Sequence, residues 1–158
     1  MLKKIISSIF LLLLFFGCAY KYNINFSAPY KIVVKTKDIA IADSGFVKKA
    51  DNYKSIQVFS VGKLVLHVEL TQNACINGHC TNRLDFNERF FGYTHYARLL
   101  DDILDKKEIY DGIDKIKAPN GFEQNIKTKN YDIAYRVNDK SIYFKDKIHH
   151  ILIKLKRL

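Results

Sequence analysis

The chain has 158 residues, and its 26 Lys and Arg outnumber its 16 Asp and Glu, so its formal net charge at pH 7 is +10. This length suits one domain of ordinary size, with 11 Phe and 10 Tyr available to fill a core. The basic residues are spread along the chain rather than gathered into a stripe, which argues against a nucleic-acid-binding protein.

The first 17 residues have the pattern of a secretory signal. Lys3 and Lys4 precede an apolar run over residues 5–16. The run is shorter than the roughly 20 residues of a membrane-spanning helix and has the length of the apolar region of a signal peptide. Gly17 then stands directly before Cys18. We therefore expect a signal over residues 1–17, a tether over 18–29 and a single β-rich domain over 30–158.

The segment Phe15-Phe16-Gly17-Cys18 resembles the lipobox of bacterial lipoproteins, in which the cysteine is diacylated on sulfur and becomes the first residue of the mature chain. The resemblance implies a membrane anchor at Cys18, because two or more acyl chains hold a protein far more firmly than one. Ala19 stands where Asp retains enterobacterial lipoproteins in the inner membrane, so we expect the periplasmic face of the outer membrane. The alternative is an ordinary secretory signal, or an uncleaved N-terminal anchor, with Cys18 incidental.

The excess of basic residues suggests a use at a membrane. Loss of residues 1–17 would remove Lys3 and Lys4 and lower the net charge from +10 to +8. A basic protein held at a bilayer gains electrostatic attraction to anionic lipid head groups. Solvated surface lysines without a partner are the alternative interpretation.

Residues 30–71 are expected to form strands joined by turns. Strand-forming segments at 32–34 and 39–41 precede expected turns at 43–45 and 50–52, with a strand beginning at Phe46 between them. The clearest of these expected strands has a period of two over eight residues, which predicts a sheet with one buried side. Its apolar face consists of Leu64, Leu66, Val68 and Leu70.

A disulfide-bonded hairpin is predicted around Asn77-Gly78, because a two-residue type I′ turn needs positive φ at both positions. In that register Ile76 lies opposite His79, and Cys75 lies opposite Cys80 in a pair whose Cα atoms are about 4.5 Å apart. This separation suits a disulfide, and an oxidising compartment favours one. Metal binding by Cys75, His79 and Cys80 competes with this interpretation, but it lacks a fourth ligand and a standard zinc spacing.

One amphipathic helix is expected over residues 93–107, with Thr94 as its cap. Asp101 and Asp102 would lie on its solvated side. The apolar side has the three-to-four spacing of a helix that packs on a sheet, and it consists of Tyr96, Leu99, Leu100, Ile103 and Leu104.

After a lysine-rich link and a turn at 119–121, the pattern returns to strands at 122–126, 131–137, 141–144 and 150–156. The order is therefore about five strands, a helical insertion and three or four further strands. Short turns between consecutive strands favour antiparallel pairing. The expected fold class is mainly β (α+β), a curled antiparallel sheet or half-barrel covered by one or two helices.

The sequence contains no recognisable catalytic machinery. We find no nucleophile motif, phosphate-binding loop or cluster of metal-ligating residues, so neither an enzyme nor a cofactor or metal is expected. His149 and His150 are neighbours that would point to opposite faces of a strand, and His67 and His95 stand alone. Binding, scaffolding or transport remains.

The order of elements and several short segments resemble LolB, a family of outer-membrane lipoproteins that accept other lipoproteins from a periplasmic carrier. Val61 stands where the family has Leu at a membrane-facing tip, and the chain has no Trp, of which that family often carries several. The segments that carry the resemblance are 50–54, 59–62, Leu99-Leu100, 120–122, 132–135 and 151–156.

The resemblance implies a half-barrel that binds acyl chains of client lipoproteins and releases them to the outer membrane, with Val61 as the membrane-facing tip. The same residues fit a dry, packed core equally well. A second hypothesis is therefore a non-catalytic β-sandwich lipoprotein that acts as an envelope scaffold or assembly partner. A third is an inhibitor that presents the Cys75–Cys80 hairpin to a wall hydrolase. The expected lining of the acyl-chain cavity is Val34, Ile56, Val58, Leu64, Leu66, Val68, Leu99, Leu100, Ile103, Ile133 and Tyr135.

Overall fold

The computed structural model describes residues 22–158, which contain eleven β-strands and two α-helices. The predicted signal, Cys18 and the first part of the tether lie outside the described residues. The strands form one antiparallel sheet. They span Phe26–Lys35 (β1), Ala40–Ala50 (β2), Tyr53–Ser60 (β3), Lys63–Leu70 (β4), Ala74–Ile76 (β5), His79–Thr81 (β6), Lys115–Ala118 (β7), Gly121–Lys127 (β8), Asp132–Asn138 (β9), Ser141–Asp146 (β10) and Ile151–Arg157 (β11).

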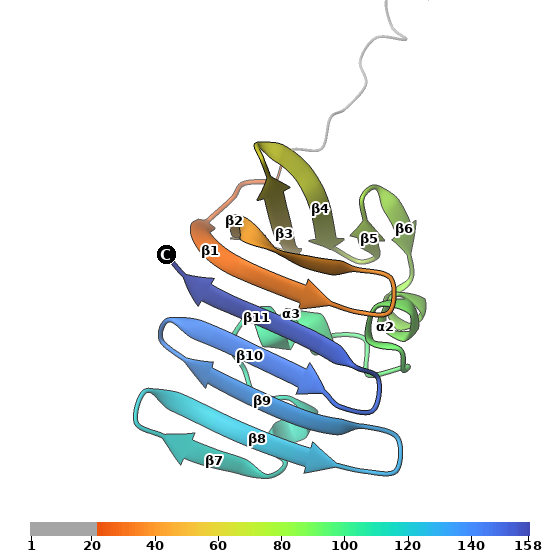
Figure 1. The fold of residues 1–158 in the computed structure, drawn as a ribbon, viewed down its shortest axis with the longest axis vertical. Helices are drawn as coiled ribbons and strands as arrows, with labels where there is room; N and C mark the ends of the chain where they lie inside the picture. Colours follow the sequence, from red (N-terminus) through yellow and green to blue (C-terminus); the bar gives the residue numbers. More distant parts are fainter. Residues whose placement is uncertain (1–21) are drawn as a thin grey trace, which may run out of the picture.

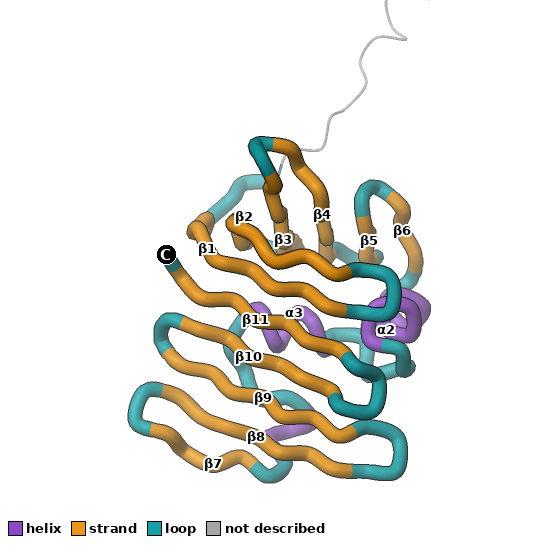
Figure 2. The backbone as a smooth tube through the Cα atoms, viewed as in Figure 1, coloured by secondary structure: helices purple, strands orange, loops and turns teal. Residues whose placement is uncertain are grey.

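The sheet is open, and its strand order is β6-β5-β4-β3-β2-β1-β11-β10-β9-β8-β7. β1 pairs with β2 on one side and with β11 on the other, so the first and last strands lie side by side in the middle of the sheet (Figure 1). Every other pairing joins strands that are neighbours in sequence, as short antiparallel turns allow. The long helical insertion connects the two edge strands, β6 and β7 (Figure 2).

The insertion contains α2 (Arg83–Phe91), α3 (Leu99–Leu104) and a 3₁₀ turn, η1 (Tyr110–Gly112). Asn82 begins α2, because its side chain accepts hydrogen bonds from the backbone N–H groups of Leu84 and Asp85. Gly92 ends α2 with a left-handed φ of 74°. Figure 1 shows α3 behind β10 and β11, on the far side of the sheet in that view.

A single apolar core joins the sheet to the insertion. It contains side chains from β1–β5 and β8–β11 and from both helices. Phe91 of α2 packs on Phe144 of β10 with ring centroids 5.6 Å apart. The Tyr135 hydroxyl donates a hydrogen bond to the backbone oxygen of Lys107 at 2.9 Å. Each fully buried apolar side chain contributes about 1.5–3 kcal/mol, so the insertion is held to one face of the sheet.

The predicted helix over residues 93–107 is wrong in extent, because only α3 is helical there. His95 and Tyr96 have no regular secondary structure, and their carbonyl oxygens accept hydrogen bonds from the buried Asn87 side chain. That contact uses oxygens that a helix would bond within itself. The earlier helix α2 was not predicted, although Asn82 and Gly92 are start and stop signals.

The turn expected at residues 43–45 is also wrong, because β2 continues through it. Gly45 lies opposite Tyr30 of β1 and Val58 of β3. A Cβ on Gly45 would collide with the backbone oxygen of Gln57. This glycine therefore permits a close approach of two strands and does not form a turn.

Two further segments expected to be irregular are strands. Residues 26–29, assigned to the tether, begin β1, and Ala28 is buried against the core. Residues 115–118, expected to be part of a link, form the edge strand β7, which pairs with β8. β7 is an edge strand with few buried side chains, so its sequence shows little alternation. Within residues 22–158 no helix is long and apolar enough to span a bilayer.

Candidate functional site

The predicted acyl-chain cavity is filled by the side chains that were expected to line it. Ten of the eleven residues are at most 1% exposed and belong to the apolar core. None of these ten lines any of the four main cavities formed by the described residues. The ten are Val34, Ile56, Val58, Leu66, Val68, Leu99, Leu100, Ile103, Ile133 and Tyr135.

Leu64, the eleventh predicted lining residue, was expected on the inward face of its strand because of simple alternation, but it lies on the outward face. The pairing of β3 with β4 shifts between Val58 and Phe59, so that Val58 pairs with Leu66 and Phe59 with Leu64. The extra residue in β4, Val65, marks a β-bulge. Leu64 consequently turns outward and is 48% exposed.

An apolar cavity of about 230 Å³ lies at the edge of the core, between the β1–β2 turn, the β5–β6 hairpin and α2. We call it the mouth cavity. Its volume is somewhat below the roughly 300–1,000 Å³ of pockets for drug-sized ligands, which suits part of one apolar chain. Its apolar lining is Ile39, Ile76, Phe86 and Phe90, and its polar lining is Thr36, Asp38, Asn77, His79, Thr81 and Arg89.

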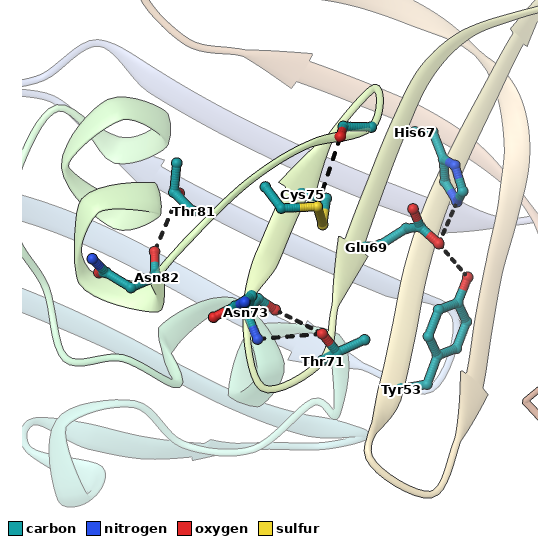
Figure 3. Close-up of a disulfide and its surroundings, with 10 residues drawn as sticks. Tyr53, His67, Glu69, Thr71, Asn73, Cys75, Thr81 and Asn82 are labelled. Atoms are coloured by element: carbon teal, nitrogen blue, oxygen red, sulfur yellow. Dashed lines mark hydrogen bonds and ion pairs between the residues drawn. A yellow bond between two sulfur atoms is a disulfide. The ribbon is translucent and has the colours of Figure 1, made fainter. Parts of the chain in front are cut away.

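The disulfide-bonded hairpin forms one wall of the mouth cavity. Cys75 and Cys80 are joined by a disulfide, as predicted (Figure 3). Ile76 lies opposite His79, which is the expected register. Asn77 and Gly78 have φ values of 49° and 84°, which confirms the expected positive φ at both turn positions. The bonded sulfur atoms cannot serve as thiolate ligands, so the competing metal interpretation of this hairpin does not apply.

A network of charged side chains fastens the insertion to the sheet. Lys54 of β3 lies 3.3 Å from a carboxylate oxygen of Asp101 and 3.3 Å from one of Asp105. Lys49 of β2 donates to Asp105 at 3.2 Å and to the backbone oxygen of Leu104 at 2.7 Å. Arg83 of α2 contacts the Asp101 carboxylate. Asp101 is buried, so the expectation of a solvated acid is wrong.

A second polar group under the sheet surrounds His95. This imidazole is 2% exposed, and its Nδ1 is hydrogen-bonded to the Tyr110 hydroxyl. Its Nε2 has no hydrogen-bond partner among the described residues. Burial lowers the pKa of His95 to about 4, against an opposing effect of Asp146. His95 is therefore neutral at pH 7 and acts as a structural residue.

His149 lies beside this group, in the turn between β10 and β11 rather than in a strand. Its Nδ1 is 2.6 Å from a carboxylate oxygen of Asp146, which is fully buried. The same carboxylate group accepts hydrogen bonds from the backbone of Asp132 and Ile148. These bonds satisfy a buried charge, so the pair stabilises the turn.

The predicted tip residue, Val61, lies in the β3–β4 turn and is 98% exposed. Its φ of 48° is rare for a β-branched side chain, which prefers negative φ. Neither the exposure nor this backbone conformation stabilises the fold.

The mouth cavity and the charged network were not predicted from the sequence. Their residues come from segments far apart in the chain, and only the α2 signals at Asn82 and Gly92 pointed to a helix beside the hairpin. No protein-family model and no curated protein matches this chain.

Proposed function

We propose that this protein is a LolB-like lipoprotein, anchored at Cys18 on the periplasmic face of the outer membrane, that binds acyl chains of client lipoproteins. The observation that carries the proposal is the placing of the insertion. It leaves one edge of an open sheet, covers a single face of that sheet, and returns to the other edge. A curled sheet that a separate segment covers on one face is a natural container for an apolar chain.

The mouth cavity is the proposed point of acyl-chain capture. It is apolar inside and polar at its rim, and Phe86 and Phe90 belong both to it and to the core. An acyl chain that displaced these side chains would enter the space between sheet and insertion. α3 is only six residues long, but four of its side chains are buried in the core, so entry of an acyl chain would have to replace their apolar contacts with its own.

The position of Val61 in an exposed turn supports a role in releasing the client's acyl chain to a bilayer. An exposed apolar residue in a strained conformation is retained most readily where it serves a function. Inserted in lipid, its side chain would recover the apolar burial that it lacks in water.

A tryptophan substitution tests the cavity, since the natural chain contains no Trp. Ile39→Trp places a larger side chain in the mouth cavity, whereas Ile116→Trp adds one at a 64%-exposed position of β7 outside it. We expect Ile39→Trp to weaken binding of a fluorescent palmitoyl peptide at least about tenfold, which is 1.4 kcal/mol. Ile116→Trp should bind as the natural protein does.

The second candidate is a non-catalytic envelope scaffold, which the filled interior favours. Absence of palmitoyl-peptide binding to the natural protein would support it. So would unchanged delivery of lipoproteins to the outer membrane after depletion of this protein, measured by membrane fractionation. Either result removes the carrier proposal.

A further inference from the structure

The sheet has a strongly basic outer face. On β1, β10 and β11 the inward side chains are buried in the core beneath the insertion. The side chains that alternate with them point away from the insertion. Five of these outward side chains are exposed lysines, which we call the basic face: Lys31, Lys35, Lys145, Lys154 and Lys156.

No acidic residue occupies an outward position on these three strands. Lys31 lies directly opposite Lys156 in the β1–β11 pair, an arrangement that destabilises a sheet. None of the five lysines forms an ion pair with another described residue. Such a concentration of uncompensated charge is best explained by an anionic partner.

Apolar side chains continue the same outer face across β2–β4. Phe46 is 41% exposed and makes an edge contact with Phe59, with ring centroids 6.2 Å apart. Leu64 and Val65 are 48% and 38% exposed. Apolar side chains beside lysines are the combination that binds the interface of an anionic bilayer.

The chain leaves the domain on this outer side. Tyr22 stacks on Tyr53 with ring centroids 4.3 Å apart. Tyr53 alternates with Lys54, whose side chain faces the insertion, so Tyr53 points outward. Only three residues lie between Cys18 and Tyr22, so the two Cα atoms are at most about 14 Å apart. An acylated Cys18 would therefore hold this side near the lipid.

We infer that the outer face of the sheet docks on a bilayer that contains anionic phospholipid, so that the insertion and the mouth cavity face away from the membrane. The argument from the short distance between Cys18 and Tyr22 rests on the lipid anchor of the proposed function. The charge pattern does not depend on whether the protein binds acyl chains.

Single tryptophans report which side contacts lipid. Tyr143→Trp lies on the outer face, opposite Lys154. Ile113→Trp lies on the other side, where the inward Gln124 side chain binds the Ile113 carbonyl oxygen. Each full-chain lipoprotein is reconstituted in vesicles of phosphatidylcholine and brominated phosphatidylglycerol. Bromine should quench Tyr143→Trp and leave Ile113→Trp unquenched, and 1 M salt should abolish the quenching, because it shortens the Debye length to about 3 Å.

The charge requirement is tested with two triple variants in the Tyr143→Trp background. The first variant replaces three lysines of the basic face by Gln (Lys31, Lys154 and Lys156), and it should lose most of the quenching. The second variant removes the same charge from exposed sites elsewhere (Lys37, Lys117 and Lys129 to Gln), and it should retain the quenching. Equal quenching of both tryptophans, or none of Tyr143→Trp, overturns the inference, and the second result directs attention to an acidic protein as the partner. Mass spectrometry of Cys18 and palmitoyl-peptide binding report separately on the proposed function.

Discussion

His95 is held neutral by its surroundings, and this gives the protein a specific response to acid. Its imidazole is buried among aromatic rings, including Phe91 and Tyr131 at centroid distances of 5.5 and 5.4 Å. Burial lowers its pKa to about 4, whereas an unfolded histidine has a pKa near 6.5. Between these values the unfolded chain binds a proton that the folded chain does not, so stability falls as the pH falls.

We predict a loss of about 3 kcal/mol of unfolding free energy from His95 between pH 6.5 and pH 4. The variant His95→Gln should be less stable at pH 7 but should lack this part of the pH dependence. Urea denaturation across the pH range measures the difference between the two proteins. His79→Gln, at an exposed position, should keep the slope of the natural protein. Identical slopes for all three proteins would contradict the assignment.

At the level of elements, the sheet depends on its weakest edge. β5 and β6 have three residues each, and β6 has no partner beyond β5 among the described strands. The Cys75–Cys80 disulfide closes this short hairpin. The hairpin forms a wall of the mouth cavity and leads directly into α2. Loss of its structure would therefore affect both the mouth cavity and the start of α2.

We predict that the double variant Cys75→Ser, Cys80→Ser lowers the free energy of unfolding by about 2 kcal/mol, the chain-entropy value for so short a loop. A reducing agent should produce a similar shift in the natural protein. The same agent should have no effect on the double variant, which serves as the control. Urea denaturation with and without reductant measures both shifts, and equal stability of all samples would show that the hairpin does not depend on the bridge.

For the molecule as a whole, anchoring and orientation are separate properties with separate causes. The acyl chains proposed at Cys18 would contribute about 0.8 kcal/mol for each buried methylene, which salt does not weaken. The basic face contributes an electrostatic attraction that salt screens. The first decides whether the protein stays on a membrane, and the second decides which side faces it.

Replacement of Cys18 by Ser therefore has a predicted outcome that differs from the loss of the basic face. Cys18→Ser should move the protein to the soluble fraction in a high-salt wash and remove labelling by palmitate. The triple variant of Lys31, Lys154 and Lys156 should remain in the membrane fraction under the same wash. Retention of unlabelled Cys18→Ser protein in salt-washed membranes would argue for the uncleaved N-terminal anchor instead.

The sequence by itself determined the local features of this protein. The alternation in β9 and β11, that of β4 from Leu66 to Leu70, and the Asn77-Gly78 hairpin with its cysteine pair depend on neighbours in the chain, and these are found as expected. The class of fold, mostly β with one antiparallel sheet, followed from the same short-range patterns.

The tertiary structure decided what depends on contacts between distant segments. The approach of β3 to β2 makes Gly45 part of a strand, and Asn87 prevents the expected helix from beginning near Thr94. The bulge beside Val58 turns Leu64 outward. The mouth cavity forms where the β1–β2 turn meets the β5–β6 hairpin and α2, and the basic face forms because β1 pairs with β11. A periodic pattern specifies which side chains share a face, but it does not specify which strands meet.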